Sequence, residues 1–122
     1  MRIEKFEEIQ AWQEARELTK MIYRITKKVR FQKDFGLRDQ IRRSSVSIMA
    51  NIAEGFGRES NKEFIHFLSY ASSSNIELQS HLYVALDQKY IANQEFNEVY
   101  TQSKKVGKLI NGFVRYLKGK QK

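Results

Sequence analysis

The two histidines, His66 and His81, are the side chains of this sequence best suited to ligating a metal or moving a proton near neutral pH. His66 follows Glu63 in a Glu-x-x-His pair, which is the spacing that carboxylate-bridged di-iron bundles use. Such a site needs two of these pairs and two further inward carboxylates, and the sequence contains one pair. On a helix, His66 also lies about 200° from Phe64, which we expect in the core. We therefore predict no metal and no cofactor.

The remaining patterns that could indicate catalysis are incomplete. Gly55-Phe56-Gly57 lacks the preceding strand and the following Lys-Ser/Thr of a phosphate-binding loop, so it indicates the end of a helix. The sequence has no cysteine and therefore no thiol nucleophile or disulfide. Serines are frequent, but none stands with a histidine and a carboxylate in a recognisable arrangement, and serines inside helices usually serve close packing. The sequence predicts a protein that is not an enzyme and that acts by binding other macromolecules.

The positive charge of the chain favours anionic partners. The formal net charge is +8 and the isoelectric point is about 9.8. Residues 93–122 contain seven Lys and Arg against two acids, and residues 1–35 contain nine against six. Two basic clusters result, one of Lys104, Lys108, Arg115 and Lys118, and one of Arg24, Lys27, Lys28, Arg30 and Lys33. A solvated face with cations near helix C-termini is the alternative interpretation of both clusters.

Apolar residues recur with the period of a helix in four segments, which predicts helices at about residues 8–29, 36–55, 61–89 and 94–118. The first stripe runs from Ile9 to Val29 and is followed by a break at Arg30 to Asp34. Ser60 and Glu63 have the spacing of a capping box before the third helix, and Asn93 is the expected N-cap of the fourth. The chain contains no proline, as long uninterrupted helices require.

These helices predict an all-α fold in one domain, residues 1–122. Short connections force consecutive helices to run antiparallel, which gives an up-down-up-down four-helix bundle. No stretch approaches the ~18 apolar residues of a membrane span, and the first residues lack the apolar run of a secretory signal. We therefore expect a cytoplasmic protein with no membrane contact.

Some residues have no place in the core of a single bundle. Ile65, Ile76 and Tyr83 lie about 100–120° from the core stripe of their helix. Small and charged residues form an outer row on the second helix, from Arg43 to Arg58. We predict that the chain associates with itself, and the candidate interface is Ser47, Ala50, Asn51, Glu54, Ile65, Ile76 and Tyr83. A wide core stripe and an ordinary polar face are the alternatives.

Residues 35–86, FGLRDQIRRSSVSIMANIAEGFGRESNKEFIHFLSYASSSNIELQSHLYVAL, resemble the signature region of the bacterial 23S rRNA intervening-sequence proteins, which are four-helix bundles. The opening FEEIQAWQEARELTKMIYRIT matches the same pattern, so the resemblance covers most of the chain. Arg43 to Ser47 and Asn51 to Gly55 are its most specific parts. The sequence departs from the family at Phe31-Gln32, where the family usually has Phe-Pro.

The resemblance implies a bundle that assembles into a ring-shaped homo-oligomer, a pentamer. It also implies kinship with the accessory variability determinant of diversity-generating retroelements, a basic pentamer that binds a reverse transcriptase and nucleic acid. Members of the family are often encoded inside inserts of ribosomal RNA genes, which favours RNA as the ligand.

We therefore predict a non-catalytic, basic, oligomeric bundle that binds nucleic acid, with RNA favoured. The candidate contacts are Arg38, Arg42, Arg43, Arg58, Lys104, Lys105, Lys108 and Arg115. The alternative is a protein-interaction scaffold that recruits a partner such as a reverse transcriptase through the Arg43–Arg58 row, without direct contact to nucleic acid.

Overall fold

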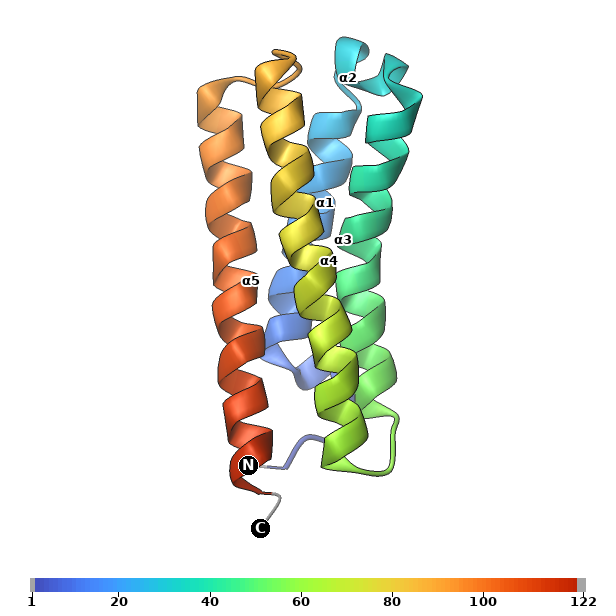
Figure 1. The fold of residues 1–122 in the computed structure, drawn as a ribbon, viewed down its shortest axis with the longest axis vertical. Helices are drawn as coiled ribbons and strands as arrows, with labels where there is room; N and C mark the ends of the chain where they lie inside the picture. The colour runs from blue at the N-terminus through green and yellow to red at the C-terminus, as the bar shows by residue number, and fades with distance from the viewer. Residues whose placement is uncertain (1, 121–122) are drawn as a thin grey trace.

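The computed structural model describes residues 2–120 and contains helices and no strand within that range. The predicted all-α fold class is confirmed. The elements are η1 (Phe6–Glu8), α1 (Gln10–Thr26), α2 (Val29–Lys33), α3 (Phe35–Phe56), α4 (Asn61–Asp87) and α5 (Asn93–Gly119). Figure 1 shows the four long helices side by side, with the short α2 at one end, beside the end of α1 and the start of α3. No helix in the described part of the chain combines the length and the hydropathy needed to cross a membrane.

The four long helices contact one another in the cyclic order α1, α3, α4, α5. The contacts between α3 and α4 run antiparallel, because the Ser74 hydroxyl donates to Ser47 while the Ser44 hydroxyl donates to Glu77. Figure 1 shows the same reversal of direction between each long helix and the next. Because α3 and α5 lie diagonally across the bundle, their outer faces point away from each other.

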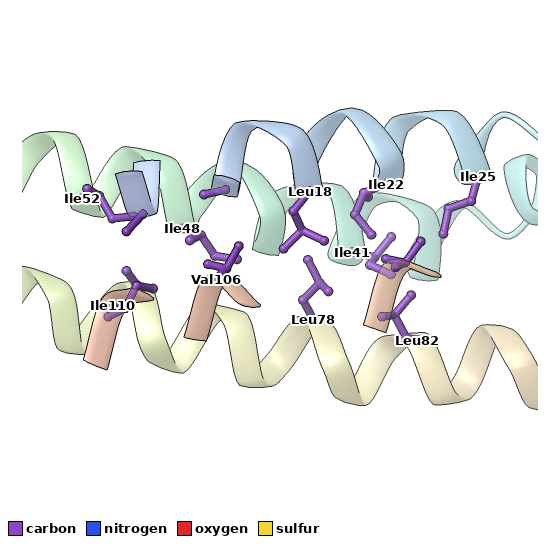
Figure 2. Packing of buried hydrophobic residues seen from close by; sticks show 14 of the residues in the cluster. Leu18, Ile22, Ile25, Ile41, Ile48, Ile52, Leu78, Leu82, Val106 and Ile110 are labelled. Atoms are coloured by element: carbon purple, nitrogen blue, oxygen red, sulfur yellow. The ribbon is translucent and has the colours of Figure 1, made fainter. Parts of the chain in front are cut away.

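The core is formed by one apolar stripe from each long helix. Figure 2 shows Leu18, Ile22 and Ile25 of α1 meeting the stripes of the other three helices. Burying each such side chain stabilises the fold by about 1.5–3 kcal/mol relative to leaving it exposed. Fully buried members of the other stripes include Ile41, Ile48, Ile52, Leu78, Leu82 and Val106.

The first helix ends earlier than the predicted range of 8–29, and a separate short helix follows. The Thr26 hydroxyl donates to the Ile22 carbonyl at 2.8 Å, and Lys28 adopts an extended backbone with ψ 139°. This turn leaves Val29 68% exposed and buries Phe31 completely. The Phe31 ring then lies 5.3 Å from the ring of Tyr90. Placing Val29 in the core stripe was wrong, because burial of the larger aromatic ring outweighs continuation of the local period.

The helix ends agree with the predicted caps at one of two positions. The Ser60 hydroxyl accepts from the Glu63 amide at 3.1 Å, as predicted for the start of α4, but the return bond of the predicted capping box, from the Ser60 amide to the Glu63 carboxylate, does not form. The predicted cap at Asn93 is wrong, because Ala92 is the N-cap and Asn93 is the first helical residue of α5. Alanine has no side-chain acceptor, so this end is stabilised by the Glu95 carboxylate, which accepts from the Ala92 amide at 2.8 Å.

Candidate nucleic-acid interface

The predicted basic residues do not form one continuous surface. Arg38, Arg42 and Arg43 lie in the first half of α3, whereas Arg58 follows the other end of that helix. The remaining four lie on α5, diagonally opposite α3. The eight residues therefore form three separate groups. Three lie near the start of α3, one lies beyond its end, and four lie on α5.

Three of the predicted arginines join the cluster that closes the first helix. We call this region the basic end; it comprises residues 23–43, which are the last turn of α1, all of α2 and the start of α3, at the top of Figure 1. Residues 23–43 contain eight Lys and Arg against two Asp and Glu. The cations are Arg24, Lys27, Lys28, Arg30, Lys33, Arg38, Arg42 and Arg43.

Arg42 is held against α1 by two contacts. Its Nε donates to the Thr26 hydroxyl at 2.8 Å, and its guanidinium carbon lies 4.7 Å from the centre of the Tyr23 ring. A cation over an aromatic face is attracted by the quadrupole of the ring, which orients the guanidinium. Tyr23 remains 37% exposed, so the pair presents a ring and a positively charged plane to solvent.

Arg38 repeats this arrangement at the start of α3. Its guanidinium carbon lies 4.9 Å from the centre of the Phe35 ring, and its Nε donates to Asp39 at 2.9 Å. Phe35 is 63% exposed, which is unusual for a phenylalanine. Aromatic rings and arginine planes are both surfaces on which unpaired nucleobases stack.

Arg43 is exposed, and its side chain forms no ion pair or hydrogen bond with residues 2–120. Arg58 is exposed at the opposite end of α3, with its guanidinium 4.5 Å from the centre of the Phe67 ring. Arg43 is therefore available to an anion at the basic end, whereas Arg58 lies at the opposite end of the bundle.

The basic set on α5 is partly used within the chain. Lys105 pairs with Glu14 of α1 at 3.3 Å. A hydrogen bond from Gln102 and the nearby Lys105 ammonium together lower the pKa of the Glu14 carboxyl. Lys104 lies 5.9 Å from the centre of the Tyr100 ring. Lys108 and Arg115 are exposed, as expected for either a solvated face or a phosphate-binding one.

The candidate interface residues fall into two groups. Ser47 accepts from Ser74 of α4 at 3.0 Å, so it lies in the contact between α3 and α4 of one chain. Asn51 is half-buried and donates to Ser47 within α3 at 3.1 Å. Ala50 and Glu54 are exposed on the outer side of α3.

On α4, Ile65 is half-buried, while Ile76 is 63% and Tyr83 49% exposed. The Tyr83 ring also packs 4.9 Å from the ring of Phe96 on α5. Ile76 is thus the most exposed apolar side chain of the three, in a stretch of α4 whose outer side is mainly serine.

A family model described as "23S rRNA-intervening sequence protein" matches residues 7–112. The chain belongs to this family. A search of the solved structures finds a protein of unknown function from the S23 ribosomal protein family of Bacteroides thetaiotaomicron VPI-5482. It is 28% identical, with a TM-score of 0.80 over 85% of this chain and 97% of that one. Among curated proteins, no match is found.

The 23S rRNA-intervening sequence family match includes the whole basic end and most of the α5 set. Of the eight predicted contacts, Arg115 lies beyond the matched residues. The family match therefore extends over the region where basic and aromatic side chains gather.

The histidines of this family member lie outside the basic end. The His66 Nε2 lies 2.6 Å from the Tyr70 hydroxyl, and the His81 Nε2 lies 3.9 Å from a Glu77 carboxylate oxygen. Within residues 2–120, no group of three or more His, Cys, Asp and Glu side chains is arranged to hold a metal ion.

Sequence reasoning missed the aromatic partners of the arginines. The spacing of Phe35 and Arg38 places them on one face of a helix, so that pair could have been found from the sequence. The Arg42 contacts with Tyr23 and Thr26 join two helices, and no local pattern predicts them.

Proposed function

We propose that this protein is a non-catalytic bundle that binds RNA through the basic end. One observation carries the proposal: residues 23–43, which contain eight cations and two acids, lie together at one end of the bundle, with the exposed rings of Tyr23 and Phe35 among them. Phosphates attract the cations without regard to sequence, and each contact releases a counterion. RNA is favoured over DNA because the description of the family refers to 23S rRNA.

The arrangement favours single-stranded or loop regions of RNA. Unpaired bases can stack on aromatic rings and on guanidinium planes, and such stacking contributes about 1–3 kcal/mol per base. Paired bases in a helix do not expose their faces in this way. Arg38 and Arg42 would orient the strand, while Arg43 and the cations of α2 would contact phosphates.

A pair of charge-matched variants tests the location. The first replaces Arg24, Lys27 and Arg43 with glutamine, because these side chains form no ion pair with residues 2–120. The second replaces Lys108, Arg115 and Lys118 of α5 with glutamine, so both variants lose the same charge. We expect the basic-end variant to bind a single-stranded RNA at least tenfold more weakly, and the α5 variant to bind within about threefold of the parent. Equal losses in the two variants would show that only total charge matters.

We further propose that the chain forms a homo-oligomer through the outer face of α4. Ile76 is 63% exposed in a stretch with few charges, and the central part of a protein contact is likewise depleted of charged residues. The resemblance to the family implies a ring of five copies. A ring would repeat the basic end around its axis, so that several weak phosphate contacts could act on one RNA.

A protein-binding scaffold is the second candidate function. Val46 is 44% exposed on the outer row of α3 that runs from Arg43 to Arg58, which gives this row an apolar contact beside its charges. A partner such as a polymerase or reverse transcriptase could bind there. Substituting Val46 and Ala50 with glutamine, which adds no charge beside Arg43, would then weaken partner capture while leaving RNA affinity unchanged.

A further inference from the structure

A groove of about 730 Å³ lies at the basic end, between α2 and the connection from α4 to α5. Three of the side chains that line it are cations, Lys28, Arg30 and Lys89, and no Asp or Glu lines it. Leu86 and the buried Ile91 supply an apolar part of the lining. A concave site with a few charged groups around an apolar surface is the usual form of a small-molecule site.

Lys89 adopts a backbone conformation that glycine normally provides. Its φ is 61°, and it is the residue with positive φ among residues 2–120. The Lys89 amide donates to Leu86 and the Tyr90 amide donates to Ala85, each at 2.9 Å, which is the hydrogen-bond pattern of a Schellman motif. Glycine fits this position without steric cost, so the lysine found here is at odds with the local backbone preference.

The other two cations differ in their partners. Lys28 pairs with Glu95 at 2.6 Å, so its charge is largely compensated. Arg30 lies 5.5 Å from the centre of the Tyr90 ring, and the Tyr90 hydroxyl in turn donates to Asp34 at 3.0 Å. Neither Arg30 nor Lys89 forms an ion pair with the described residues. Two cations without an ion-pair partner among residues 2–120 therefore flank an apolar surface, and one of them, Arg30, is oriented by the Tyr90 ring.

We propose that this groove binds a single nucleotide. Arg30 and Lys89 would hold its phosphate group, and Ile91, Leu86 and the exposed Val29 would contact its base. The nucleotide can be a free nucleoside phosphate or the phosphorylated end of an RNA strand, since both present the same chemistry. The groove shares Arg30 with the extended phosphate contacts proposed above, whereas Lys89 and the apolar lining belong to the groove alone. Variants at Lys89 can therefore lose nucleotide binding while RNA binding at the basic end persists.

Amide chemical shifts of the ¹⁵N-labelled protein would locate the ligand. The probes are adenosine monophosphate, inorganic phosphate, and one short oligoribonucleotide prepared with and without a 5′-phosphate. We expect shifts at residues 28–30 and 89–93. Saturation by the monophosphate identifies a free nucleotide, whereas a response only to the 5′-phosphorylated strand identifies a strand end.

Three results would overturn the proposal. The amides of the groove could fail to respond to any probe. Inorganic phosphate could bind as tightly as the nucleotide, which would leave no role for the apolar lining. The strands with and without the 5′-phosphate could give the same shifts while the monophosphate gives none. The groove would then contact the internal phosphates of an RNA strand and would not recognise a nucleotide.

Substitutions at Lys89 test the cation directly. Lys89→Gly removes the charge and suits the backbone, so we expect nucleotide affinity to fall at least tenfold while the unfolding temperature rises. A higher unfolding temperature would show that this variant still folds, so its loss of affinity would come from the missing charge. Lys89→Arg keeps the charge and should bind within about threefold of the parent, and Lys89→Gln should lose affinity without the gain in stability. Unchanged affinity in both Lys89→Gly and Lys89→Gln would contradict the site.

Discussion

Replacing Gly55 with alanine tests the close contact between α3 and α4, which sets the position of α3 in the bundle. A Cβ built at Gly55 would lie 2.7 Å from Phe64 Cδ1 and 2.8 Å from Phe67 Cβ. Carbon atoms that are not bonded to each other normally stay about 3.5–4.0 Å apart. The Phe64 ring can rotate away, but the Phe67 Cβ is attached to the backbone and can move only if α4 moves.

The size of the effect follows from two opposing contributions. Overpacking a well-packed contact costs about 1–3 kcal/mol, and two clashes below 3.0 Å place this case near the upper limit. Alanine gains up to about 1 kcal/mol over glycine in helix propensity. The net loss in the free energy of unfolding is therefore about 2 kcal/mol. With about 2.1 cal/mol/K of unfolding entropy per residue, this loss lowers the unfolding temperature by about 8 °C.

Gly36→Ala provides the matched control within the same helix. The nearest atom to its added Cβ is an Asp34 carboxylate oxygen at 3.9 Å, which is an ordinary contact. This variant should be as stable as the parent or slightly more stable. Thermal unfolding followed by circular dichroism compares the two. If Gly55→Ala unfolds at the same temperature as Gly36→Ala, the α3–α4 contact is not as close as the structure has it.

Three further predictions concern the polar contacts and the outer face of α4. Ser103→Ala removes the hydroxyl that donates to Asn75 at 2.7 Å, and because Asn75 is 3% exposed, chemical denaturation should show a loss of about 1–3 kcal/mol. The backbone amide at the N-cap of α5, and then Lys28, lower the pKa of Glu95, so this carboxylate stabilises the fold above its ordinary pKa and the contribution disappears as pH falls through the lowered value. Lys28→Gln should raise that pKa in an NMR titration, and an unchanged pKa would show that the ion pair has no effect in solution. Ile76→Glu should lower the molar mass measured by light scattering without changing helicity, and an unchanged mass would exclude this face as the contact between copies.

The helices could be predicted from the sequence because their apolar period is a local property. Ile41, Ile48 and Ile52 recur on one face of α3, and all three are fully buried. The end of α1 could not be predicted in the same way. Whether Val29 or Phe31 enters the core depends on Tyr90, which is distant in the sequence and packs against Phe31.

The candidate site could be predicted only in part, for a related reason. Composition and position placed Arg38 and Arg42 among the expected contacts. The orientation of Arg42 depends on Tyr23 and Thr26 of another helix, whereas the ring beneath Arg38, Phe35, lies on the same helix. The backbone of Lys89 is set by the packing of the α4–α5 connection, and no pattern of residue types shows that a lysine occupies a position suited to glycine.

The dependence of RNA affinity on salt concentration tests the central claim most directly. Fluorescence anisotropy of a labelled single-stranded RNA would give the association constant from low to moderate salt. If about half of the cations at the basic end contact phosphates, the logarithm of that constant should fall with the logarithm of salt concentration with a slope of about −3. The absence of binding at low salt, or a slope near zero, would contradict RNA binding through phosphate contacts at the basic end.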